Sequence, residues 1–139
     1  DSAHVPNIDI QSFHRTSTAL HKAIQSGKVL AAHDVSEGGV AVTISEMLFG
    51  GDCGAELDFG DSDTPIENIF FNETAGCFVI EVDDEETAAE LFGSIPHQVI
   101  GKTKEARRLD VSQGDITMPS VDLDTLKSAW KRPLQEVFA

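Results

Sequence analysis

The sequence predicts an α/β fold in which a mixed β-sheet is sandwiched by helices. Segments with apolar residues three or four positions apart, typical of amphipathic helices, alternate along the chain with short apolar or alternating runs typical of strands. Glycine, proline or paired acidic residues separate many of these segments. The resulting order is α-β-α-β-turn-β-α-β-β-β-α, which predicts helices that cover a sheet.

Four helices are expected, and each has a recognisable boundary. The first follows Pro6 and ends before Gly27, and the second ends at Gly50-Gly51. Asp83 and Asp84 favour the start of the third helix. The fourth is expected to stop near Pro133, because proline disfavours helical backbone at the residue before it. The expected helical ranges are 10–24, 38–49, 85–92 and 122–130.

Six strands are expected from short apolar or alternating runs. The first, KVLAAH, is almost entirely apolar and predicts a buried strand. The last two flank Gly114-Asp115, which predicts a hairpin. Residues 60–68 are acidic and contain Pro65, which indicates a loop with room for one helical turn. The expected strand ranges are 28–33, 55–59, 76–82, 99–100, 107–111 and 116–118.

The length and charge limit the class of protein. Residues 1–139 fit one domain, with 1–8 as an extended lead-in. Ten Lys and Arg face 24 Asp and Glu, so the net charge is −14. Such a surface repels nucleic acid and anionic lipid, and it suggests an origin at high salt. No apolar run reaches the roughly 20 residues of a membrane span, so we expect a soluble, cytoplasmic protein.

The cysteines and histidines predict no dedicated metal site. Cys53 and Cys77 are too few for a disulfide framework or a zinc site. Cys77 lies in an apolar, strand-like run, where cysteine usually behaves as a small hydrophobe. The five histidines show no HxxxH or HExxH spacing.

The most informative segment is His-Asp-Val-Ser-Glu-Gly-Gly at residues 33–39, between an expected strand and an expected helix. Ligands of α/β sheets bind at the carboxyl ends of strands, and helix N-termini suit phosphate. Gly38 and Gly39 would let a ligand or another backbone approach closely. Asp34 and Ser36 could cap the helix, and Asp34 could instead hold a metal-phosphate unit or a ribose hydroxyl. The alternative is purely structural, because Asp and Ser are preferred N-caps and paired glycines make tight turns.

Three segments resemble one family. Residues 31–51 resemble the HDxSxGG segment, with its following helix, of the second repeat of phosphoribosylformylglycinamidine synthase. Residues 69–82 (IFFNETAGCFVIEV) and 126–134 (LKSAWKRPL) resemble later segments of the same repeat, in the same order. The chain is thus identified as a member of the C-terminal domain family of AIR synthase-related proteins, whose sandwich is partly ferredoxin-like. It is similar to the last domain of the second repeat, as a fragment of a longer enzyme.

The resemblance implies a part in purine biosynthesis. The complete ligase uses ATP and Mg²⁺ to convert formylglycinamide ribonucleotide and glutamine-derived ammonia to formylglycinamidine ribonucleotide. Its partners would be an N-terminal ATP-binding domain of the same chain, a glutaminase and small accessory subunits, and a homodimer through the sheet stays open. The fragment is expected to be inactive and to bind no nucleotide tightly. The resemblance assigns it no catalytic residue and no metal ligand.

The nucleotide-cleft candidates are Asp34, Ser36, Gly38, Gly39 and Glu73. One departure weakens anion binding, because Cys77 stands where relatives carry an arginine, the side chain that binds phosphate or carboxylate bidentately. Two alternatives remain open at this stage. The chain could belong to a related ATP-using enzyme such as the hydrogenase-maturation dehydratase, or it could be a purely structural or interaction domain. A Gly38→Val substitution is expected to separate a ligand-binding role from a structural one.

Overall fold

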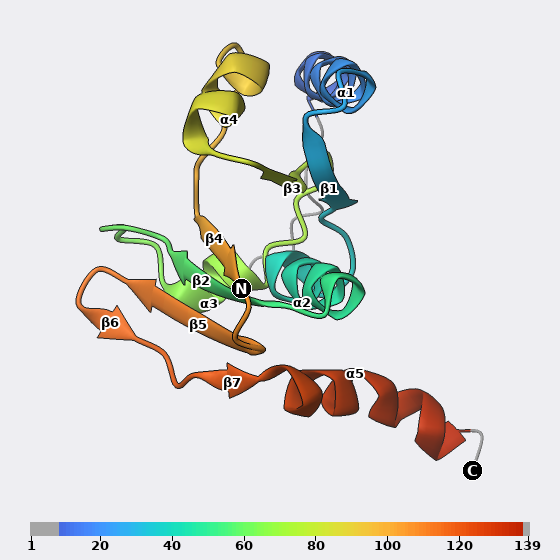
Figure 1. Cartoon of the computed structure of the whole chain (residues 1–139), viewed down its shortest axis with the longest axis vertical. Coiled ribbons are helices and arrows are strands. Elements are labelled where there is room, and N and C mark those ends of the chain that lie inside the picture. Colours follow the sequence, from blue (N-terminus) through green and yellow to red (C-terminus); the bar gives the residue numbers. More distant parts are fainter. Residues whose placement is uncertain (1–8, 138–139) are drawn as a thin grey trace. The chain divides into compact units, whose positions relative to one another are not determined.

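The computed structural model describes residues 9–137, so the expected lead-in over residues 1–8 lies outside the described residues (Figure 1). The chain forms two compact units. Unit 1 contains the residues up to Thr43 together with Phe70–Val99, and unit 2 contains Ile44–Ile69 and the residues from Ile100 onward. Among the described residues, no helix combines the length and the apolar character needed to cross a membrane.

Unit 1 is a two-stranded sheet with two helices on it. Its elements are α1 (Ile10–Gln25), β1 (Val29–Asp34), β3 (Phe78–Val82), α4 (Glu85–Phe92) and the first turn of α2 (Gly39–Gly51). Strands β1 and β3 pair antiparallel. Figure 1 shows α1 beside α4, and apolar side chains of both helices meet those of the strands. This small core contains Leu20, Ala23 and Phe92, with Phe78, Ile80 and Val82 packed against it.

Acidic caps start both outer helices of unit 1. The Asp9 carboxylate accepts the backbone N–H groups of Gln11 at 2.9 Å and Ser12 at 3.2 Å. The Asp84 carboxylate accepts the N–H of Thr87 at 2.8 Å, and this hydrogen bond holds the pKa of Asp84 below its usual value. Both carboxylates satisfy N–H groups that have no partner inside the helix. The expected start of the third helix at the Asp83-Asp84 pair is confirmed.

Unit 2 is built on a mixed sheet. Strand β2 is parallel to β5 and antiparallel to β4, while β6 and β7 both pair antiparallel with β5. The strand order is β4-β2-β5-β6. The elements of unit 2 after α2 are β2 (Gly54–Asp58), α3 (Ile66–Phe70), β4 (Gly101–Lys104), β5 (Arg108–Gln113), β6 (Ile116–Thr117), β7 (Val121–Asp122) and α5 (Leu123–Val137).

Alternating side chains of β2 and β5 form the core of unit 2. Ala55 and Leu57 are buried on β2, and Leu109 and Val111 are buried on β5. Gly54 is required at the start of β2, because a Cβ there would lie 1.9 Å from the carbonyl oxygen of Ala106. The other buried apolar residues of this unit are Ile44, Leu48, Phe59, Ile66 and Leu123.

The mixed α/β class is confirmed, and so is the hairpin between β5 and β6. The strands divide between two sheets, however, rather than forming one. The strand expected over residues 28–33 is found as β1, but the expectation that it is buried is wrong. Within the described residues β1 pairs with β3 alone, its positions alternate between half-buried and exposed, and Leu30 is 58% exposed.

Three further elements differ from expectation. The strand expected over residues 99–100 begins two residues later, as β4 at Gly101, although the Ile100 carbonyl already accepts the Asp58 N–H at 2.8 Å. Strand β7 was not expected, because two residues carry no periodic signal. Helix α5 continues through Pro133 to Val137. The proline leaves the Ala129 carbonyl without its helical partner, but Ala129 is exposed, so water can bind that oxygen.

Candidate functional site

The turn from β1 to α2 is held by backbone hydrogen bonds within unit 1. The Val35 N–H donates to the Cys77 carbonyl at 2.9 Å, which ties the turn to the start of β3. The Gly39 N–H donates to the Ser36 carbonyl at 3.0 Å, which closes the turn itself. Val35 is buried, so its side chain anchors a segment in which Asp34, Ser36 and Glu37 are exposed.

Both glycines of the turn are required by the fold. Gly38 and Gly39 have φ angles of +82° and +65°, a conformation that side chains with a Cβ rarely adopt. A Cβ on Gly39 would lie 2.6 Å from the Phe70 carbonyl oxygen, and one on Gly38 would lie 2.3 Å from Cγ2 of Val42. The close approach at Gly39 is therefore used by the chain's own backbone, whereas the neighbour of Gly38 is the Val42 side chain.

Glu73 binds the N-terminal end of α2. Its Oε1 accepts the Gly38 N–H at 2.8 Å, across 35 positions of sequence. A carboxylate here is favourable, because the first N–H groups of a helix carry a partial positive charge. The structure thus brings together Gly38, Gly39 and Glu73, three of the five predicted residues.

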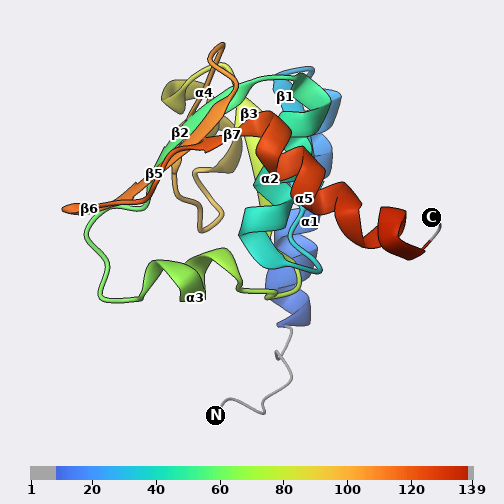
Figure 2. The same cartoon turned by 90° about the horizontal axis from the view of Figure 1, so that it is seen from below.

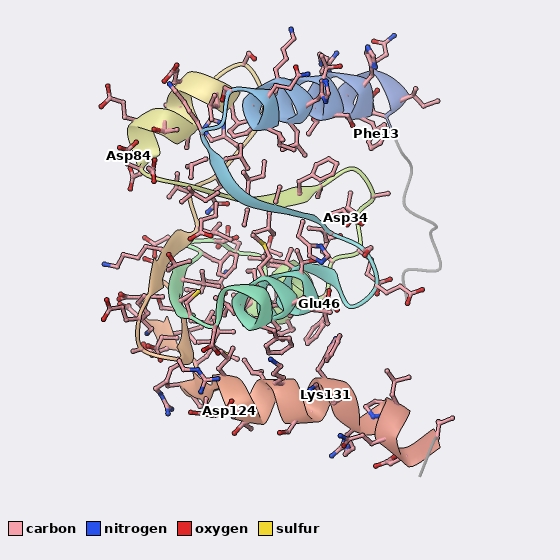
Figure 3. All side chains as sticks on the ribbon, turned by 45° about the vertical axis from the view of Figure 1, so that its right-hand side comes forward. Phe13, Asp34, Glu46, Asp84, Asp124 and Lys131 are labelled. Carbon is pink, nitrogen blue, oxygen red and sulfur yellow. The ribbon has the colours of Figure 1, made fainter. Side chains whose placement is uncertain are left out.

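Asp34 and Ser36 lie on the same turn with different surroundings. The Asp34 side chain is 64% exposed, and its carboxylate lies 3.5 Å from Nδ1 of His33 (Figure 3). The side chain of Ser36 is exposed as well. Both residues were expected as possible caps of α2. Within residues 9–137, the side chain that accepts an N–H group of this turn is that of Glu73 instead, and the group is that of Gly38.

Thr43 is a residue of this turn that the sequence patterns did not single out. Its side chain is buried, and its hydroxyl lies 3.1 Å from the Asp34 carbonyl and 3.0 Å from the Gly39 carbonyl. These contacts join the end of β1 to the first turn of α2. The sequence did contain one signal for this role, a threonine one turn into an otherwise apolar helix face. A hydroxyl buried there is expected to find a hydrogen-bond partner.

Cys77 does not behave as the small core residue that was expected. It precedes β3 and is exposed, because the turn at Gly76, with a φ angle of +87°, lies directly before it. A Cβ on Gly76 would lie 2.9 Å from the Phe13 ring, so that glycine also accommodates α1. A thiol thus lies at an exposed position of the turn, where the resemblance predicted an arginine.

The turn offers no cationic side chain to a bound anion. Residues 33–39 contain no Lys or Arg, and Glu73 already occupies one N–H group with its own negative charge. Among residues 9–137, no group of three or more His, Cys, Asp or Glu side chains could hold a metal ion.

The two units and the glycine turn define a mixed α/β domain. The family model described as "AIR synthase related protein, C-terminal domain" matches residues 8–113. The chain belongs to this family.

Named relatives agree with this family. Phosphoribosylformylglycinamidine synthase subunit PurL of Lactobacillus helveticus is 31% identical over 131 residues, which are 93% of this chain and 17% of that protein. The PurL subunit of Synechocystis is 32% identical, over 96% of this chain and 18% of that protein. The chain thus spans less than a fifth of these relatives, and the family resemblance seen in the sequence is confirmed.

Solved structures share the fold. Thermotoga maritima PurL complexed with FGAR superposes with a TM-score of 0.77 at 19% identity, covering 91% of this chain and 23% of that one. The structure of PurLQS from the same organism gives a TM-score of 0.78 at 18% identity, with 90% and 23% coverage. At this identity the likeness shows the fold alone.

Proposed function

We propose that residues 1–139 are one domain, the C-terminal domain of the second repeat of a phosphoribosylformylglycinamidine synthase. The proposal rests on two shares, namely how much of this chain matches its relatives and how much of each relative this chain spans. PurL relatives match more than nine tenths of this chain, yet the chain spans less than a fifth of them. A related dehydratase is not favoured, because the relatives that support the family are PurL subunits.

The reaction of the longer enzyme would be an ATP-dependent amide-to-amidine conversion. The amide oxygen of formylglycinamide ribonucleotide attacks the γ-phosphorus of ATP, and ADP leaves. Ammonia then adds to the activated carbon, the C–O bond breaks, and phosphate departs with the former amide oxygen. Glutamine supplies the ammonia, and Mg²⁺ bound outside this chain would neutralise phosphate charge during the transfer.

The chain's own part in this proposal is positional. The N-terminal ATP-binding domain of the same polypeptide would supply the ATP and Mg²⁺ contacts. The turn at Asp34, Ser36, Gly38 and Gly39, with Glu73 on its N–H group, would form one wall of a nucleotide cleft. Support comes from the exposed side chains of Asp34 and Ser36, which remain accessible to a facing domain. Alone, the chain would be inactive and would bind no nucleotide tightly.

The proposed assembly follows from the same family. A glutaminase and small accessory subunits would join the longer chain in the cytoplasm, and two copies could associate through the sheet. Sedimentation of the purified longer enzyme, with and without the glutaminase, measures both associations. A monomer that binds no glutaminase at micromolar concentration contradicts this part of the proposal alone.

The function is tested on the full-length polypeptide that contains this chain. Supplied with ATP, Mg²⁺, ammonium and formylglycinamide ribonucleotide, it should form ADP and formylglycinamidine ribonucleotide in equal amounts. ADP formation that does not depend on the ribonucleotide would exclude the proposed reaction.

A second experiment separates a cleft wall from a purely structural turn. Gly38→Val is unsuitable, because its positive φ and the contact with Val42 make unfolding the expected result. Ser36→Ala and Asp34→Asn keep the backbone and change only exposed side chains. As part of a cleft wall, they should lower activity while leaving the unfolding temperature within about 2 °C, since exposed substitutions usually change stability by less than about 0.5 kcal/mol. Unchanged activity in both variants supports the structural alternative.

A further inference from the structure

Helix α5 carries an apolar stripe that the rest of unit 2 covers only along its first half. Apolar residues recur at three- and four-residue spacing, which places them on one side of a helix. They are Leu123, Leu126, Trp130, Pro133, Leu134 and Val137. Leu123 is only 1% exposed, whereas Trp130, Leu134 and Val137 are 46%, 61% and 73% exposed. The stripe therefore continues past the point where unit 2 covers it.

Contacts with α2 mark the end of the covered half. The Trp130 ring lies 5.7 Å from the Phe49 ring, centre to centre, and its Nε1–H donates to Glu46 at 2.9 Å. Lys127 lies over the same Phe49 ring. Beyond Trp130, every described residue of α5 is exposed, and Figure 2 shows this part of the helix extending away from β5 and β7.

The exposed half of α5 has little local reason to stay helical. Pro133 removes a backbone hydrogen bond and typically costs about 3 kcal/mol inside a helix. One ion pair, between Arg132 and Glu136 at 3.7 Å, lies on this half, and exposed pairs of this spacing contribute at most about 0.5 kcal/mol. An amphipathic face usually supplies the missing stability by packing against a partner.

We propose that the exposed stripe of Trp130, Leu134 and Val137 docks against another part of the same longer polypeptide, an apolar surface with an acidic rim facing Lys131. The inference rests on the proposed function, which makes this chain a fragment of a longer one. The PurL relatives are more than five times as long as the region that they share with this chain. Most of such a polypeptide thus lies outside the structure and is available as the occupant.

Area and charge favour a tethered partner over a second copy. Three partly exposed side chains offer on the order of 300 Å², while a stable complex of separate chains buries roughly 800 Å² on each partner. A surface joined to α5 through the same polypeptide acts at high effective concentration and needs less area. Two copies of a chain with a net charge of −14 would also repel each other.

Hydrogen exchange of the full-length polypeptide tests the proposal. In the wild type, the amides of residues 134–137 should exchange at least about tenfold more slowly than in the Leu134→Ser/Val137→Ser variant, a ratio equivalent to about 1.4 kcal/mol. The matched control is Gln135→Ser, which lies between them in sequence but off the stripe and should leave the rates unchanged.

Three results would overturn the docking proposal. They are unprotected amides in the wild type, equal protection in the stripe variant, and protection that rises with protein concentration, which would identify a second copy as the occupant. Exchange is measured without substrate, so it is independent of activity. A wild type that protects these amides but forms no formylglycinamidine ribonucleotide would contradict the proposed function and leave the docking surface intact.

Discussion

The hydrogen bond from Gly38 N–H to Glu73 should contribute measurably to stability. Glu73→Ala removes an acceptor 2.8 Å from the first turn of α2. Loss of a capping side chain lowers the stability by about 0.5–2 kcal/mol. The attraction between a negative charge and the helix N-terminus contributes about 0.3–1 kcal/mol. Because Glu73 is exposed, water can replace part of the bond, so we expect a loss of about 1 kcal/mol. Glu73→Gln keeps an oxygen acceptor and should lose only about half as much.

Urea unfolding of the chain, followed by circular dichroism, measures these differences. A loss of about 1 kcal/mol corresponds to a fall of roughly 4 °C in the unfolding temperature for a chain of this size. Glu105→Ala is the matched control, because Glu105 is an exposed carboxylate in the turn before β5, and it should change stability by less than about 0.5 kcal/mol. The reasoning is refuted if Glu73→Ala matches the control, or if Glu73→Gln is the more damaging of the two substitutions.

Three further predictions concern strain, pH and salt. Gly39→Ala should lower the free energy of unfolding in urea by at least about 1 kcal/mol more than Gly27→Ala does. Both glycines have positive φ, but only Gly39 has backbone atoms against its Cβ position. Equal losses in the two variants would exclude the contact. Arg107 donates two hydrogen bonds to Asp124, at 2.9 and 3.0 Å, and lowers the pKa of that carboxyl below its usual 3.8. The stability that this ion pair contributes is present above pH 3.8 and is lost as the pH falls through the lowered pKa. The unfolding temperature of the wild type should therefore exceed that of Asp124→Asn by less in acid. A difference in unfolding temperature that does not depend on pH would contradict this assignment. Salt screens the repulsion within a chain whose net charge is −14, and the screening length falls roughly threefold between 0.05 M and 0.5 M KCl. The chain should therefore unfold at a higher temperature in 0.5 M KCl. An unchanged unfolding temperature would contradict the high-salt hypothesis.

Features encoded by neighbouring residues could be predicted from the sequence. Helix α4 begins at Asp84 because a carboxylate there reaches an N–H three residues away, and α1 ends before Gly27 for similarly local reasons. The hairpin between β5 and β6 depends on the tight turn at Gly114, which has a positive φ of 54°. Each of these signals acts over a few residues, so the pattern itself is sufficient.

Features that depend on distant segments could not be predicted in the same way. The pairing of β2 with β5 joins residues more than fifty positions apart, and the contact of Glu73 with Gly38 spans 35 positions. The glycine pair was recognised as permitting a close approach, but the sequence could not show that segment 70–72 of the chain itself makes this approach at Gly39. Pro133 was expected to end a helix, whereas exposure to water lets α5 continue beyond it.

The most direct test of the proposed function follows one oxygen atom. The full-length polypeptide is supplied with ATP, Mg²⁺, ammonium and formylglycinamide ribonucleotide labelled with ¹⁸O at the amide that becomes an amidine. If this chain is a domain of the amidoligase, each phosphate released should carry one labelled oxygen, because the amide oxygen leaves on phosphorus. Phosphate that carries no label, or that forms without the ribonucleotide, would contradict the assignment.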